Sequence, residues 1–174
     1  MHPIEQKKFI ETIQNSIDFL REQYLMCKKQ SFGLWNPQNP STRVPHWKTA
    51  ILWWNHKPFK PVQKLVPKTV EMLKHGPCHK ATGWMELDAN STVPKHNHID
   101  WGEKYILQVP IVIPKGDIGF CIDDHQIYHW KAHELFVFDA RKNHTAYNNT
   151  EKSRVILAMD FDSSWRETLE PYMK

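Results

Sequence analysis

Residues 133–161 read HELFVFDARKNHTAYNNTEKSRVILAMDF, and this stretch defines the fold more clearly than any other. Two of its segments, 134–138 and 154–161, are rich in Val, Ile, Leu and Phe, a composition typical of β-strands. The residues between them are mostly polar and include several Asn, Lys and Thr, which favour turns. We therefore predict two short strands, with His144 in the turn region between them.

Segments of the same character precede this stretch from residue 81 onward. They are short, rich in Val, Ile, Phe and Trp, and separated by Gly, Asn, Pro or Asp. We predict strands at 82–88, 104–113 and 117–122, with a hairpin turn at Lys115-Gly116-Asp117. Many short strands at regular spacing favour a sandwich or a jelly-roll barrel, so the fold class is predicted to be mainly β with N-terminal helices.

The N-terminal third of the chain has a different pattern. Apolar residues recur at helical spacing, which predicts one amphipathic helix over about 3–29. Residues 31–61 interleave five prolines with four tryptophans, which predicts an ordered wrapping segment with a short strand near 50–54. A second helix is predicted from Pro67 to His75.

The length of 174 residues is about the size of one domain with one core. We predict a single domain over 1–174. Its parts are a helix with a wrapping segment at 1–60, a barrel core at 61–162 and a C-terminal tail at 163–174.

Charge and cysteine content restrict the partners and the compartment. The net charge of +4 comes with scattered lysines, so no nucleic-acid partner is predicted. Three widely spaced cysteines without a C-x-x-C argue against a disulfide framework and favour a reducing cytoplasm. The N-terminus lacks a secretory signal, and the longest apolar run has about five residues, far short of a membrane span. We therefore expect a cytoplasmic protein that has no membrane partner.

One set of residues has the order expected of a metal site. His98-Ile99-Asp100 precedes an apolar run, His144 follows much later, and Arg154 comes ten residues after His144. On extended backbone, alternate side chains share a face, so the histidine and carboxylate of H-x-D can grip one ion. Two histidines and one carboxylate form the facial triad that holds Fe(II) in non-heme oxygenases. The arginine is suited to binding the carboxylate of a co-substrate.

Each of these residues also has an ordinary interpretation. H-x-D is common by chance, a turn histidine often bonds the backbone, and a strand arginine is usually at the surface. The joint order on a β-rich chain favours the metal site. His96 competes with His98 for the first position, and Asp100 favours His98. The other histidines show no comparable pairing and are predicted at the surface or around the site: His46, His56, His75, His79, His125, His129 and His133.

Residues 67–162 resemble the aspartyl/asparaginyl β-hydroxylase family of Fe(II)- and 2-oxoglutarate-dependent oxygenases. The resemblance covers a little over half of the chain and leaves 1–60 unexplained. It is carried by PKTVEML (67–73), STVPKHNHID (91–100), LQVPIVIP (107–114) and the stretch 133–161. In that family a strand ending in Phe-Asp leads to a histidine, an Asn-rich turn, and an arginine that opens a strand closing on Asp. Here these are Phe138, Asp139, His144, Asn148-Asn149, Arg154 and Asp160.

The resemblance implies a double-stranded β-helix, a cupin-like jelly-roll barrel. It further implies that iron and 2-oxoglutarate hydroxylate a C–H bond while 2-oxoglutarate is decarboxylated to succinate. Some members keep only two histidines and have Gly where Asp100 stands. We expect the complete triad here, with His98, Asp100 and His144 on Fe(II) and Arg154 on 2-oxoglutarate.

The chain departs from the family after the first ligand. Members often carry R-x-H-x-P there, and the matching positions are Ile106, Gln108 and Pro110. Gln108 can still donate a hydrogen bond to the co-substrate, and Tyr105 or Lys104 can substitute for the lost groups. Strand alternation cannot place all three inside the barrel.

The expected substrate is an amino acid, a peptide or a protein side chain resembling Asp, Asn or Pro, oxidised by O₂. Trp84 and Trp101 are predicted walls of its pocket, although both are equally suited to an ordinary core. Two other functions remain open. One is a cupin-type metal enzyme without 2-oxoglutarate, favoured if Arg154 faces outward. The other is a non-catalytic barrel that binds a ligand or a protein.

Overall fold

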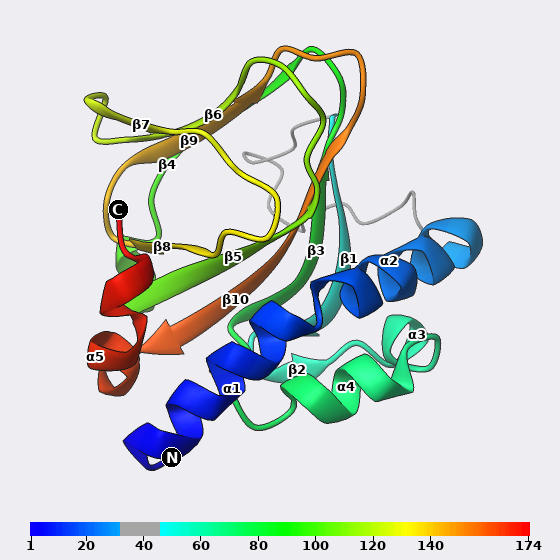
Figure 1. The fold of residues 1–174 in the computed structure, drawn as a ribbon, viewed down its shortest axis with the longest axis vertical. Helices are drawn as coiled ribbons and strands as arrows, with labels where there is room; N and C mark the ends of the chain where they lie inside the picture. The colour runs from blue at the N-terminus through cyan, green and yellow to red at the C-terminus, as the bar shows by residue number, and fades with distance from the viewer. Residues whose placement is uncertain (32–45) are drawn as a thin grey trace.

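The computed structural model describes residues 1–31 and 46–174, and it contains two β-sheets that face each other (Figure 1). The larger sheet has the order β2-β1-β3-β10-β5-β8 and the smaller one β4-β9-β6-β7. The strands are β1 (Trp47–Trp54), β2 (Lys57–Pro58), β3 (Ala81–Leu87), β4 (Ser91–His96), β5 (Lys104–Val112), β6 (Ile118–Ile122), β7 (Gln126–Tyr128), β8 (Phe136–Asp139), β9 (His144–Asn148) and β10 (Arg154–Asp162). This arrangement confirms the predicted mainly β, double-stranded β-helix fold.

Helices cover the outer face of the larger sheet. They are α1 (Pro3–Asn15), α2 (Ile17–Ser31), α3 (Lys60–Gln63), α4 (Pro67–Leu73) and α5 (Arg166–Leu169), with the 3₁₀ turns η3 (Ser163–Trp165) and η4 (Glu170–Tyr172) on either side of α5. A further 3₁₀ turn, η2 (Ile99–Trp101), lies between β4 and β5. In Figure 1, α1 and α2 run along this sheet on the side away from β6 and β7. Within the described ranges, no helix is long and apolar enough to cross a membrane.

The predicted N-terminal helix is two helices in the structure. Ser16 separates them, and its amide donates to the carbonyl of Ile13 in a tight cap. The polar Gln14-Asn15-Ser16 sequence favours such a break, because Asn and Ser propagate a helix poorly. The apolar stripe predicted from the sequence is buried against the sheet as expected: Ile10, Ile13, Ile17, Leu20 and Tyr24. Residues 32–45 of the Pro/Trp-rich segment lie outside the described residues.

Strand alternation divides the molecule into two cores. On β10, Val155 and Leu157 face the helices, whereas Ile156 and Ala158 face the space between the sheets. The same alternation on the neighbouring β5 turns Leu107 to the helices. The inner core therefore lines the space in which a site can form.

The predicted strands are present, but β2, β4, β7 and β9 were not predicted. His144 is the first residue of β9, so its assignment to a turn is wrong. The polar composition of this strand conceals it. Asn148 is fully buried, because its amide donates to the backbone carbonyls of Leu87, Asp88 and Lys152. Such burial depends on partners far away in the sequence and leaves no apolar pattern.

Candidate functional site

A cavity of about 590 Å³ lies between the two sheets. Most of its wall is apolar and comes from strands of both sheets. The apolar lining residues are Trp47, Ile51, Trp54, Ala81, Met85, Val93, Trp101, Ile106, Phe120, Phe138, Ala146, Ile156 and Ala158. The polar lining residues are Thr49, His96, Asn97, His98, Asp100, Gln108, His144 and Arg154.

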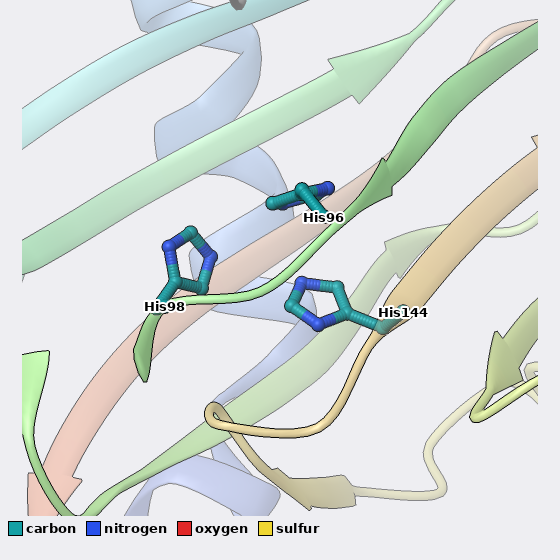
Figure 2. Close-up of side chains that lie close together, drawn as sticks. All are labelled: His96, His98 and His144. Atoms are coloured by element: carbon teal, nitrogen blue, oxygen red, sulfur yellow. The ribbon is translucent and has the colours of Figure 1, made fainter. Parts of the chain in front are cut away.

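Three histidines form a cluster in this cavity (Figure 2). His96 ends β4, His98 follows on the next loop, and His144 begins β9, which pairs with β4. Their candidate ligand atoms all lie within 4.8 Å of one another. The ring centroids are 4.3 Å apart for His96–His144, 5.0 Å for His96–His98 and 5.3 Å for His98–His144.

Backbone hydrogen bonds fix the orientation of two of these rings. Nδ1 of His144 lies 2.9 Å from the carbonyl of Lys142, and Nδ1 of His96 lies 2.8 Å from that of Pro94. A carbonyl only accepts, so each Nδ1 carries the proton and each Nε2 keeps its lone pair. His98 is held differently, by stacking on Trp101 at 4.2 Å. This support resembles that of metal-binding histidines, whose second nitrogen usually donates to a carbonyl or carboxylate.

The environment keeps the three imidazoles neutral. Burial lowers the pKa of His144 to about 3 and that of His98 to about 4, and the neighbouring His96 adds to both shifts. Burial also lowers the pKa of His96. A neutral imidazole can donate a lone pair to a cation, whereas a protonated one cannot.

The cluster fits a divalent metal such as Fe(II). Imidazole suits Fe, Zn, Cu and Ni, and none of the three rings needs to lose a proton. Nitrogens in neighbouring positions on one ion, each at about 2.1 Å, are about 3.0–3.4 Å apart. The candidate ligand atoms, which lie within 4.8 Å of one another, would therefore approach by up to about 1.8 Å to share an ion.

Asp100 lines the cavity but is not part of the cluster. The expectation that His98 and Asp100 share one face of an extended strand is wrong, because Ile99–Trp101 form a 3₁₀ turn that leaves Asp100 exposed. The alternate residues that do come together are His96 and His98, two positions earlier. The His-x-His order was therefore the signal in the sequence for a third histidine in the cluster.

Arg154 enters the cavity from the start of β10 as a buried cation. Its residue is 2% exposed, and its Nε has no hydrogen-bond partner among the described residues. The described residues also give it no ion pair; its guanidinium stacks on Trp130 with the central carbon 4.5 Å from the ring centroid. Burial without a neighbouring carboxylate lowers the pKa of Arg154 to about 9, so it is still charged at neutral pH.

Gln108 lines the same cavity, with its amide orientation fixed by Trp130. The indole Nε1 donates to Oε1 of Gln108 over 2.9 Å. Since an indole N–H only donates, the amide oxygen must face Trp130, and the NH₂ group is left as a donor for the cavity. Trp130 was missed in the sequence because it lies in the loop after β7, where no periodic pattern marks it.

Some of the predicted site residues lie in the cavity wall, and others lie outside it. His98, His144, Asp100, Arg154, Gln108 and Trp101 line it. Tyr105 and Trp84 lie on the opposite faces of β5 and β3, in the core beneath the helices. The hydroxyl of Tyr105 donates to Glu103 instead. The buried hydroxyl of Thr49, which has no hydrogen-bond partner within residues 1–31 and 46–174, is a further polar group in the wall that the sequence did not indicate.

Comparisons with known proteins agree with this picture. A family model described as aspartyl/asparaginyl beta-hydroxylase matches residues 14–164. An ornithine lipid ester-linked acyl 2-hydroxylase of Rhizobium tropici is 30% identical over 108 residues, which cover 58% of this chain and 32% of that protein. The match thus spans about a third of that relative's length.

One solved structure shows the same fold, and a second is similar in part. A 2OG-Fe(II) oxygenase family oxidoreductase from Burkholderia pseudomallei has a TM-score of 0.53 and 9% identity, covering 82% of this chain and 77% of the other. The cupin domain of Schizosaccharomyces pombe Cnp3 has a TM-score of 0.45 and 11% identity, covering 72% of each chain.

Proposed function

Because the chain belongs to the aspartyl/asparaginyl β-hydroxylase family, we propose that it is a hydroxylase that uses Fe(II) and 2-oxoglutarate. The observation that carries the proposal is Arg154. Its guanidinium is buried and has no counter-ion among the described residues, which is costly, and an anionic ligand that entered the cavity would compensate the charge. The histidine cluster lines the same cavity, so a metal and a carboxylate can meet there.

Named side chains take the two roles. We propose that His98 and His144 hold Fe(II), and the position of His96 supports it as the third nitrogen ligand. When bound, Fe(II) supplies the chemistry in which 2-oxoglutarate and O₂ give succinate and CO₂ while one oxygen atom enters a C–H bond. Arg154 and the NH₂ group of Gln108 bind the distant carboxylate of 2-oxoglutarate, and the apolar walls exclude water around it.

The walls also favour one class of substrate. Arg154 is the one Lys or Arg side chain among the described lining residues, and on this proposal it is paired with the distant carboxylate of 2-oxoglutarate. An aspartyl carboxylate would then find no second Lys or Arg to pair with among the described lining residues, which is unfavourable in a largely apolar cavity. We therefore propose an apolar carbon chain as the substrate group. A prolyl side chain meets this condition, and so does an acyl chain, which the Rhizobium relative hydroxylates according to its name.

The proposal is tested by anaerobic titration of the protein with Fe(II) and then 2-oxoglutarate, followed by the weak visible charge-transfer band of the chelate. We expect a band that saturates with 2-oxoglutarate. Metal binding without such a band would reject 2-oxoglutarate and favour a cupin-type enzyme that uses another co-substrate. No metal binding at all would favour a non-catalytic barrel.

The substrate class is tested separately by succinate release on exposure to O₂. Peptides containing Asp, Asn or Pro and amphiphiles with short acyl chains are the probes. We expect stimulation by probes that carry an apolar chain or a prolyl ring. Stimulation by the Asp peptide alone would contradict the argument from the cavity walls.

The third metal ligand is tested by a matched pair of variants, His96→Ala and Asp100→Ala. Mn(II) affinity measured by equilibrium dialysis should fall by about 100-fold or more in His96→Ala, since loss of even a supporting residue costs 10- to 100-fold. It should change little in Asp100→Ala, because that carboxylate lies outside the cluster. The reverse result would restore the two-histidine, one-carboxylate set, with the turn at Asp100 rearranged around the ion.

A further inference from the structure

We propose that Trp130 is a positioning residue that prepares Arg154 and Gln108 as one binding unit for a carboxylate. The inference rests on the proposed function in one respect, because it takes 2-oxoglutarate as the ligand. It concerns a residue that contacts neither the histidine cluster nor, on this proposal, the ligand itself. Trp130 acts through its two neighbours.

The indole uses two different parts of its surface for the two partners. Its N–H edge donates to Oε1 of Gln108 over 2.9 Å. Its face lies against the guanidinium of Arg154, 4.5 Å from the central carbon. All three side chains are buried, Trp130 at 5%, Gln108 at 6% and Arg154 at 2% exposure. Few alternative positions are therefore open to any of them.

Each contact leaves the ligand-binding part of the partner free. Stacking stabilises the cation through the face of the guanidinium, whose N–H groups lie in its plane and remain available. The hydrogen bond occupies the carbonyl oxygen of Gln108, so the NH₂ group cannot turn toward Trp130. The result is a set of donors without an acceptor of their own among the described residues, as a carboxylate requires.

Trp130 is itself held firmly. It packs edge-on against Phe120 and Tyr128, at centroid distances of 5.8 and 6.5 Å. The preceding residue, His129, anchors the loop through Nδ1, 2.9 Å from the carbonyl of Ile118. Phe120 also stacks on His144 at 5.5 Å, so one aromatic ring contacts both Trp130 and the histidine cluster. A fixed support of this kind preorganises donors before the ligand arrives.

The test is a double-mutant cycle of Trp130→Phe and Gln108→Leu in the Fe(II)-loaded protein under anaerobic conditions. Phenylalanine keeps an aromatic face for Arg154 and removes the N–H donor. The affinity for 2-oxoglutarate is read from the charge-transfer band, and Fe(II) affinity is measured in parallel. Trp165→Phe is the matched control, because Trp165 is equally buried at 4% exposure but packs beneath the helices.

We expect Trp130→Phe to weaken 2-oxoglutarate binding by about 10-fold, because Gln108 then no longer holds its hydrogen bond to the charged ligand. Fe(II) affinity should not change. Gln108→Leu should weaken it at least as much. Trp130→Phe should have no further effect in the Gln108→Leu background, because its action passes through Gln108. Trp165→Phe should leave the affinity unchanged.

Additive effects of the two substitutions would overturn the inference. An unchanged affinity for 2-oxoglutarate in Gln108→Leu would also overturn it, and this second test remains even if Trp130→Phe fails to fold. If the wild type binds Fe(II) without 2-oxoglutarate, the proposed function fails. The same cycle is then run with succinate by calorimetry, where additivity or absence of binding overturns the inference and non-additivity supports it.

Discussion

His144→Ala should abolish metal-dependent turnover and remove most of the affinity for Fe(II). His144 is the most buried member of the cluster, at 5% exposure. Its Nδ1 donates to the carbonyl of Lys142, and its Nε2 lone pair has no hydrogen-bond partner in the described part of the chain, so it is left for a metal. Its loss leaves two imidazoles on one short segment of chain. The ion would then lose the ligand that joins β4 to β9.

A thermal shift gives a readout that does not depend on activity. A metal present at 100 times its dissociation constant stabilises the native state by about 2.7 kcal/mol. For a chain of this size that corresponds to a rise in Tm of roughly 5–10 °C in the wild type. We expect no significant rise in His144→Ala.

The control for this variant is His125→Ala, which removes an exposed histidine from the turn after β6. It should show the shift of the wild type. A His144→Ala protein that folds and still gains stability from Fe(II) would contradict the assignment. His98→Ala gives a second test if the contacts of His144 with Phe120 and Phe138 prove necessary for folding.

Arg154→Met should lose 2-oxoglutarate and become more stable at the same time. Removal of a buried charged partner weakens binding of an anion by about 100-fold or more. In the ligand-free protein, however, the guanidinium is buried and the described residues give it no counter-ion. Methionine has a similar shape and no charge, so the free energy of unfolding should rise by about 1–3 kcal/mol.

Two measurements on this variant check the two effects. The charge-transfer titration should require far more 2-oxoglutarate, with Fe(II) affinity nearly unchanged. Urea unfolding of the metal-free protein should show the gain in stability, which corresponds to roughly 2–12 °C in Tm. A variant less stable than the wild type would mean that Arg154 has a structural partner. The proposal that it is kept unpaired to bind an anionic ligand would then be wrong.

The sequence by itself determined the fold class and the order of the main functional groups. Alternation of apolar residues is a local property, so the strands that carry Gln108 and Arg154 could be recognised without neighbours. The same alternation shows why Tyr105 faces the helices once Gln108 faces the cavity. The spacing from His98 to His144 and on to Arg154 was enough to suggest that the three belong to one site.

Only the tertiary structure decided which side chains meet. A single turn of 3₁₀ helix moved Asp100 out of the histidine cluster, and the pairing of β4 with β9 brought His96 beside His144. Trp130 acquired its contacts from a loop packed across the barrel. These outcomes depend on strand register and on packing between distant segments, which are non-local. A pattern along the chain defines the face of each strand, but it does not define which residue lies opposite.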